Sequence, residues 1–432
     1  MNLTEVQILT LAPDAASQKA GKDLAKTDKW VSYGADTTAI WGECQGSGNK
    51  PYQTQIDSQN IAFKCSCPSR KFPCKHGLGL LLLFSKNGSV FVAKEQPLWV
   101  KDWISKRSEK SEKTDGGTSK PIDEAAQAKR LQARVKKVND GIEELLLWIK
   151  DIIRNGLTNI PGKDPPLRNM SKRMVDAQAP GLSGILNSFE EINFYKEGWQ
   201  SLFLDRLLTL YLLISGYKNL DLLNSELKQE ILSWIGFSQS HEELKAQEGI
   251  RDDWFVMGKQ VNTEAKLTTE RNWLYGLNSK RYALVLQFYV SNQFKGFTLT
   301  SGSVIDAELV FYNQGLSIRA FLKQQHETKK FMPVIGYNNW KEVIAGQVAV
   351  YEKNPFTNEL PVIVEQLKPV AYNEQWWLKD MENDVMLIKL PGEALWRFLA
   401  LGGGRSARIA LVGKENEFMP LGMWLKNEYQ VI

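Results

Sequence analysis

The stretch that decides the fold of the N-terminal part is FKCSCPSRKFPCKH, residues 63–76. It holds three of the four cysteines and one of the three histidines of the chain. Cys65 and Cys67 form one pair, and Cys74 and His76 form a second pair after six intervening residues. Three thiolates and one imidazole make a closed tetrahedral set that suits Zn²⁺. The spacing therefore predicts a zinc site with these four residues as ligands.

The residues around the ligands support this prediction. Lys64, Arg70, Lys71 and Lys75 are close in sequence, and residues 62–76 contain no acid. Positive neighbours lower the pKa of thiols and favour the metal-bound form. Because all four positions are filled locally and none is left open for water, we expect one structural zinc ion per chain. A chance cluster of buried cysteines with a core histidine would not produce two matched pairs with short spacers.

The elements that carry the ligands can also be predicted. Residues 52–57 and 61–67 are expected to be strands, so that Cys65 and Cys67, two apart on one strand, point to the same side. Residues 77–84 are expected to form a buried helix. Further toward the N-terminus, residues 14–25 favour a helix and residues 37–44 a strand. The fourth cysteine, Cys44, is expected to be a small buried residue outside the zinc site.

The pattern C-x-C, six residues, then C-x-H resembles the SWIM zinc finger. The flanking sequences WGECQGSGNKPYQTQID and CSCPSRKFPCKHGLGLLLL are similar to bacterial SWIM-domain proteins. So are ARVKKVNDGIEELLLWIKDIIRNGL, RMVDAQAPGLSGIL and RNWLYG further along, so the resemblance extends over most of the chain. It implies a ββα-like zinc module, the same four ligands, and contacts with DNA or protein. It also implies an adaptor role, with a MoxR-type AAA+ ATPase or a von Willebrand factor A protein as partner.

Length and composition set the broader class. The 432 residues correspond to about two to four domains, and 43% apolar with 24% charged residues is ordinary for a soluble protein. A net charge of +5 is small for this length, so any electrostatic argument must be local. The beginning of the chain lacks the pattern of a secretory signal, and the apolar runs 78–84 and 202–217 are too short or carry charges. We therefore expect a cytoplasmic protein with no membrane contact.

The rest of the chain divides by composition. Residues 105–122 have almost no apolar residue and predict a flexible charged linker after a zinc domain at 1–104. A long helix is expected between Asp123 as N-cap and Gly156 as the residue after its end. Further helices are expected at 171–178, 202–215 and 225–235, which makes 123–247 a helical domain. The apolar stripe of the long helix consists of Leu131, Val135, Val138, Ile142, Leu145, Ile149 and Ile152.

The last part of the chain, residues 248–432, is expected to be a β-rich α+β domain. Its strands are rich in aromatic and branched residues, and two helices are expected at 340–351 and 393–400. The whole chain is therefore predicted to be an α+β multidomain protein. The expected strands are 254–257, 271–275, 282–290, 306–312, 385–390 and 408–412.

Two functions are consistent with these features. The leading prediction is a zinc-binding, non-enzymatic interaction or adaptor protein that binds a protein partner. The alternative is a nucleic-acid-binding protein, because cationic and aromatic residues on a rigid loop suit a phosphate backbone and an exposed base. Against this alternative, the cations can simply neutralise the thiolates while the aromatic ring packs inward. The candidate contact residues are Lys50, Tyr52, Arg70, Lys71 and Phe72.

No catalytic residues are predicted, and we expect the protein not to be an enzyme. The GGGRS sequence at 402–406 lacks the spacing of a phosphate-binding loop and is expected to end a helix. His241 and His326 lie in polar segments without a nearby nucleophile. Asp252 and Asp253 are explained by a turn at the end of a strand.

Overall fold

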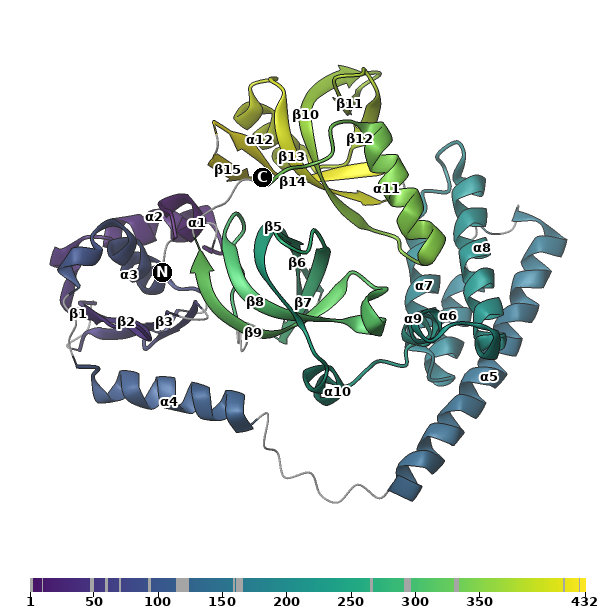
Figure 1. Ribbon diagram of the computed structural model, residues 1–432, viewed down its shortest axis with the longest axis horizontal. Coiled ribbons are helices and arrows are strands. Elements are labelled where there is room, and N and C mark those ends of the chain that lie inside the picture. The colour runs from purple at the N-terminus through teal and green to yellow at the C-terminus, as the bar shows by residue number, and fades with distance from the viewer. Residues whose placement is uncertain are drawn as a thin grey trace.

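In the computed structural model the N-terminal module, a helical bundle and a six-stranded C-terminal sheet lie around a central β-barrel (Figure 1). The α+β class predicted from the sequence is therefore confirmed, with strands at the N-terminus, helices in the middle and strands at the end. No helix among the described residues has both the length and the apolar character needed to cross a membrane. The structure describes residues 3–9, 11–46, 50–58, 61–69, 71–91, 95–113, 124–157, 160, 166–264, 267–290, 297–329, 334–414, 416–426 and 428–432.

The N-terminal module is a four-stranded antiparallel sheet in the order β1-β2-β3-β4, with helix α3 packed on it. The predicted ββα arrangement of β3, β4 and α3 is confirmed, and the sheet extends it by β1, which the sequence did not predict. The module consists of α1 (Glu5–Leu9), α2 (Ala15–Leu24), η1 (Thr27–Lys29), β1 (Trp30–Ala35), β2 (Ala39–Cys44), β3 (Tyr52–Asp57), β4 (Ala62–Cys65), α3 (Lys75–Lys86), η2 (Gly88–Val90) and α4 (Leu98–Lys113).

Helices α2 and α3 cross at very close range because glycines lie at the crossing. A Cβ atom on Gly79 would stand 2.7 Å from the Cβ of Leu24, and one on Gly21 would stand 2.9 Å from that of Leu78. Asp14 caps α2, since its carboxylate accepts a hydrogen bond of 2.7 Å from the N–H of Ser17. This crossing holds α2 close to the start of α3, where two of the predicted ligands lie.

Helix α4 corrects part of the predicted linker at 105–122. The helix extends to Lys113, so the first half of that segment is helical. The polar composition of this segment suggested a flexible linker, but lysine, glutamate and arginine are good helix formers even when no apolar residue is present. Residues 114–123, with the predicted N-cap Asp123, lie outside the described part of the chain.

The helical part is a bundle around one apolar core. The stripe of α5 is buried from Val138 to Ile152, whereas Leu131 is 53% exposed because the helix begins well before the bundle (Figure 1). Gly156 follows the helix with φ +75, as predicted. The helices are α5 (Glu124–Asn155), α6 (Pro166–Asp176), α7 (Pro180–Ser188), η4 (Phe189–Glu191), α8 (Trp199–Lys218), η5 (Leu220–Leu222), α9 (Ser225–Ile235) and α10 (His241–Ala246).

The β-rich region holds two sheets. The first five strands close into a barrel in the order β5-β6-β7-β9-β8, and the others form a sheet in the order β12-β11-β10-β13-β14-β15. Helix α12 stops before Gly403, which has a left-handed conformation, so GGGRS ends a helix as expected. The elements are β5 (Ile250–Glu264), β6 (Leu267–Gly276), β7 (Tyr282–Val290), β8 (Val304–Phe311), η6 (Tyr312–Gly315), β9 (Arg319–Lys329), α11 (Trp340–Lys353), β10 (Leu360–Tyr372), β11 (Gln375–Lys379), β12 (Val385–Ile388), α12 (Gly392–Gly402), β13 (Ala407–Lys414), β14 (Glu417–Leu425) and β15 (Glu428–Val431).

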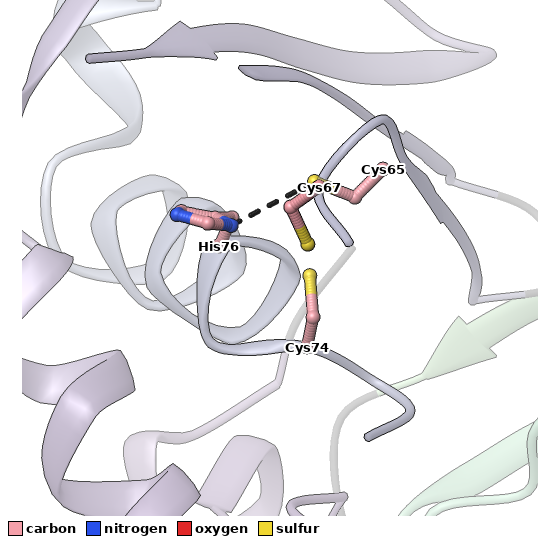
Figure 2. A group of neighbouring side chains, drawn as sticks. All are labelled: Cys65, Cys67, Cys74 and His76. Atoms are coloured by element: carbon pink, nitrogen blue, oxygen red, sulfur yellow. Dashed lines mark hydrogen bonds between the residues drawn. The ribbon is translucent and has the colours of Figure 1, made fainter. Parts of the chain in front are cut away.

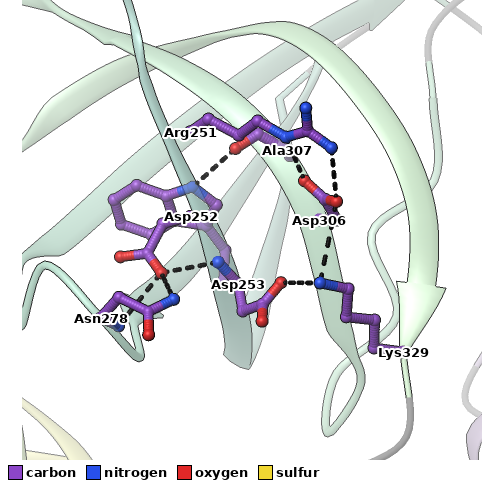
Figure 3. A network of polar contacts seen from close by, with 8 residues as sticks. Arg251, Asp252, Asp253, Asn278, Asp306, Ala307 and Lys329 are labelled. Carbon is purple, nitrogen blue, oxygen red and sulfur yellow. Dashed lines mark hydrogen bonds and ion pairs between the residues drawn. The ribbon is translucent and has the colours of Figure 1, made fainter.

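The aspartates at the start of β5 have structural partners (Figure 3). One carboxylate oxygen of Asp252 accepts hydrogen bonds from the backbone and the side chain of Asn278, in the turn between β6 and β7. Asp253 forms an ion pair of 2.6 Å with Lys329 on β9. These acids hold a turn and a strand in place, but they lie within β5 itself and not in a turn at its end, as the sequence suggested.

A buried glutamate joins the bundle, the barrel and the C-terminal sheet. Glu230 on α9 is only 5% exposed. Its carboxylate accepts hydrogen bonds of 3.0 Å from Trp234 on the same helix and from Asn354 at the end of α11. It also accepts one from Asn313 in η6, which follows β8 of the barrel. One carboxylate therefore satisfies donors from all three parts.

We predict that Glu230→Ala lowers the free energy of unfolding by about 3 kcal/mol, because it leaves buried amide groups without an acceptor. The exposed Glu226 on the same helix provides the control, and Glu226→Ala should cost less than about 1 kcal/mol. Urea unfolding of both variants measures the difference. Equal stability of the two variants would show that the Glu230 contacts do not join the three parts.

Candidate metal centre

Two elements bring the predicted ligands together. Cys65 is the last residue of β4, and Cys74 is the N-cap of α3, with His76 in the first turn of that helix. The three sulfurs and the ligand nitrogen of His76 all lie within 4.8 Å of one another (Figure 2). The Sγ of Cys65 lies 3.8 Å from the Nδ1 of His76. Within the described residues this is the one group of this kind, and it comprises the four residues predicted from the sequence.

One detail of the prediction was wrong. The strand ends at Cys65, so Cys67 lies just beyond it and does not share its strand geometry. The backbone of Ser66 still pairs with Gln53 of β3, since its N–H donates to the Gln53 carbonyl at 3.0 Å. Cys67 therefore reaches the cluster from a turn held against the sheet.

The pKa values of the three thiols indicate that a bound cation would stabilise the cluster. The pKa of the Cys74 thiol is lowered to about 4, chiefly by its hydrogen bond with Cys65 and also by those with His76 and the N–H of Gly77. The same hydrogen bond, together with burial, raises the pKa of Cys65, and burial raises that of Cys67. Without a metal, ionisation of one thiol therefore opposes ionisation of the other two, and only one thiol ionises readily. A divalent cation at the centre favours all three thiolates at once.

Neighbouring groups orient the ligands. The hydroxyl of Thr54, a fully buried residue of β3, lies 3.2 Å from the Sγ of Cys65 and can donate to its thiolate. The ring of Tyr52 packs against that of His76, with the ring centroids 5.0 Å apart. Cys74 stands at the positive end of α3, which favours a thiolate there. These contacts orient the ligand side chains in the folded module.

The fourth cysteine is separate from the cluster. Cys44 is fully buried, lies in the core of the module and contacts the carbonyl of Gln45 through its sulfur. It is not among the four grouped ligands.

Most of the candidate contact residues have partners inside the protein. The Nζ of Lys71 lies 2.7 Å from a carboxylate oxygen of Asp14, and this contact is the main reason that the pKa of Asp14 falls to about 2. Phe72 packs against Phe63 and the module core, with the ring centroids 6.2 Å apart. Lys50 is exposed, and Tyr52 packs on His76 as described above. Arg70 lies outside the described residues.

Comparison with protein families identifies both the module and the bundle. The model of the SWIM zinc finger matches residues 52–84, which span β3, β4 and α3 with all four ligands. This chain is a SWIM domain-containing protein. The model of the SWIM-associated four-helix bundle domain matches residues 133–235 of the same protein, from within α5 to the end of α9. Neither the curated proteins nor the solved structures that were compared gave a match.

The donor set fits zinc. Three sulfurs and one imidazole nitrogen satisfy a tetrahedral zinc ion completely, and their mutual separations allow them to surround one ion. The SWIM finger and the convergence of the four side chains therefore indicate a zinc-binding module.

We predict that removing the metal unfolds this module and spares the rest of the protein. The binding free energy of such zinc sites, about 10–16 kcal/mol, is also folding free energy. Hydrogen–deuterium exchange with and without a strong chelator provides the measurement, with the bundle and the barrel as internal controls. Protection should be lost in β3, β4 and α3 and kept in α8 and β7. Unchanged exchange in α3 would contradict a structural role for the metal.

Proposed function

We propose that this SWIM domain-containing protein is a non-enzymatic adaptor in which one structural zinc ion stabilises the N-terminal module and the bundle binds a protein partner. The observation that carries the proposal is an uncovered apolar stripe on α8. Leu208 is 59%, Tyr211 44% and Leu212 48% exposed. These three residues follow the i, i+3, i+4 spacing, so they share one face of the helix.

The opposite side of α8 is also apolar. Phe203, Leu207 and Leu210 are buried in the bundle core. Contiguous apolar surface on a soluble protein commonly marks an interaction site, and here it lies on a helix whose other apolar face is already buried. The exposed stripe therefore supports a protein partner with a complementary apolar surface.

The contacts of the zinc module favour this proposal over nucleic-acid binding. Lys71 is paired with Asp14, and Phe72 packs against Phe63. A phosphate backbone would have to compete with the first contact, and the second keeps the ring of Phe72 packed on the module. The resemblance to SWIM-domain proteins suggests a MoxR-type AAA+ ATPase or a von Willebrand factor A protein as the first partners to test.

We predict that the double variant Leu208→Glu/Leu212→Glu loses the partner, because two carboxylates would have to be buried in an apolar interface. Leu98→Glu/Leu131→Glu is the matched control, since both leucines are exposed and lie on other helices, at 78% and 53%. Affinity purification of tagged full-length proteins should recover the same partner with the wild type and the control, and not with the α8 variant. Recovery with all three proteins would exclude α8 as the interface.

A salt titration distinguishes the nucleic-acid alternative. A protein interface of apolar residues should keep its affinity as salt rises, whereas binding to DNA or RNA weakens linearly on a log–log plot. For zinc-loaded protein we expect no steeply salt-dependent binding to short single- or double-stranded DNA and RNA. Steep salt-dependent binding that weakens in Arg70→Ala/Lys71→Ala would instead support a nucleic-acid-binding function.

A further inference from the structure

The side chains inside the barrel are apolar at one end and polar at the other. One end of the interior is filled by apolar side chains such as Trp254, Leu274 and Val285. Because side chains alternate along a strand, Asn272 and Glu270 of β6 point to the same side as Leu274. Glu270 pairs across the sheet with Gln287 of β7. The other end of the barrel interior is therefore polar.

A cavity of about 390 Å³ opens at this polar end. Within the described part of the chain, the barrel contributes Lys259, Glu270 and Tyr289 to its wall, together with three threonines. The zinc module contributes the other wall, which includes Phe63 and Phe72. The volume lies within the range of sites for small ligands, and an apolar wall facing a few polar groups is typical of them. The three threonines are Thr263, Thr268 and Thr298.

Glu270 lines this cavity and has one buried carboxylate oxygen without a hydrogen bond. The residue is only 6% exposed, and its Oε1 forms no hydrogen bond within the protein. The Nζ of Lys259 is 3.7 Å away, which makes an ion pair that is too long for a hydrogen bond. A buried carboxylate oxygen without a donor is unfavourable, so a ligand that supplies N–H groups would be stabilised there.

The charges at the site are already balanced. Lys259 compensates Glu270, and the pKa of Tyr289 is raised to about 12 by burial and by the neighbouring Glu270, which keeps the phenol neutral. A charged ligand would upset this balance in a partly buried place. The site therefore favours a neutral ligand that donates hydrogen bonds to the carboxylate and accepts one from the ammonium group.

We propose that the mouth of the barrel binds a guanine ring. The edge of guanine presents a carbonyl oxygen beside two N–H donors, which matches an ammonium group beside a carboxylate. The carbonyl would face Lys259, the two donors would face Glu270, and the ring would lie against the wall formed by Phe63, Phe72 and Pro73. The same ring can come from a free nucleoside or from a base in a single strand.

This site is separate from the proposed contact of α8 with a protein partner, so the failure of one proposal leaves the other untouched. The zinc site nevertheless supports the cavity. Pro73 immediately precedes the ligand Cys74, and Phe63 lies two residues before the ligand Cys65 on β4. Metal coordination therefore holds both sides of the wall that the zinc module provides.

The experiment is a calorimetric titration of zinc-loaded, full-length protein with guanosine and with inosine, which lacks only the 2-amino group. We expect saturable binding of guanosine and at least tenfold weaker binding of inosine, because one donor to Glu270 is lost. The pentanucleotides TTGTT and TTITT, with I for inosine, distinguish the sources. Tighter binding of TTGTT than of guanosine identifies a base in a strand, and the reverse identifies a free nucleoside.

Variants locate the site. Glu270→Gln and Lys259→Met should each weaken guanosine binding at least tenfold. Val261→Phe should also do so by filling the mouth, and as Val261 is 55% exposed, this change need not disturb the core. Glu327→Gln, at an exposed carboxylate of β9, is the control and should bind like the wild type. Absence of guanosine binding, equal binding of inosine, or unchanged binding in both Glu270→Gln and Val261→Phe would overturn the proposal.

Discussion

The N-terminal module depends on the convergence of three sulfurs and one imidazole within 4.8 Å of one another. Left alone, this arrangement is unfavourable, because neighbouring buried thiols cannot all ionise and an ionised one repels the next. A zinc ion at the centre bonds to all three thiolates and to the imidazole, so the same closeness becomes favourable. The strand β4, the turn after it and the first turn of α3 are thus held at one point, and the wall that this module presents to the barrel follows from that constraint.

The bundle, the barrel and the C-terminal sheet are held together by apolar packing and hydrogen bonds. Each has its own apolar core, the barrel and the C-terminal sheet share a further one, and the buried carboxylate of Glu230 accepts hydrogen bonds from all three parts. Buried hydrogen bonds of this kind add a modest amount to the free energy of unfolding, but they form only when the parts are correctly oriented. The proposed partner surface on α8 belongs to the bundle, whereas the module and the barrel enclose a separate cavity between them.

The sequence predicted the zinc ligands because the chemistry is local and the spacing is short. It also predicted β7 and α9 with the bounds found in the structure, since turn formers and helix caps mark their ends. It missed β1, and it treated the end of α4 as a linker, because local polarity does not show what tertiary contacts and helix propensity provide. It placed Cys67 on a strand, whereas β4 ends at Cys65.

The closed barrel and the cavity at its mouth were beyond sequence reasoning. Lys259, Glu270 and Tyr289 come from three strands, and only the register of the barrel brings them together. Phe72 was considered as an external contact, but it packs against Phe63 and forms part of the wall of this cavity. Long-range strand pairing, which no local pattern encodes, therefore determines this second candidate site.

X-ray absorption at the zinc edge, recorded on protein purified with its metal, is the most direct test of the central claim. A site built by Cys65, Cys67, Cys74 and His76 predicts three sulfurs at about 2.3 Å and one nitrogen at about 2.0 Å from one zinc ion. Such a shell would show that the ion is closed off and structural. A shell with a water oxygen and fewer than three sulfurs, or protein that folds and purifies without zinc, would contradict it.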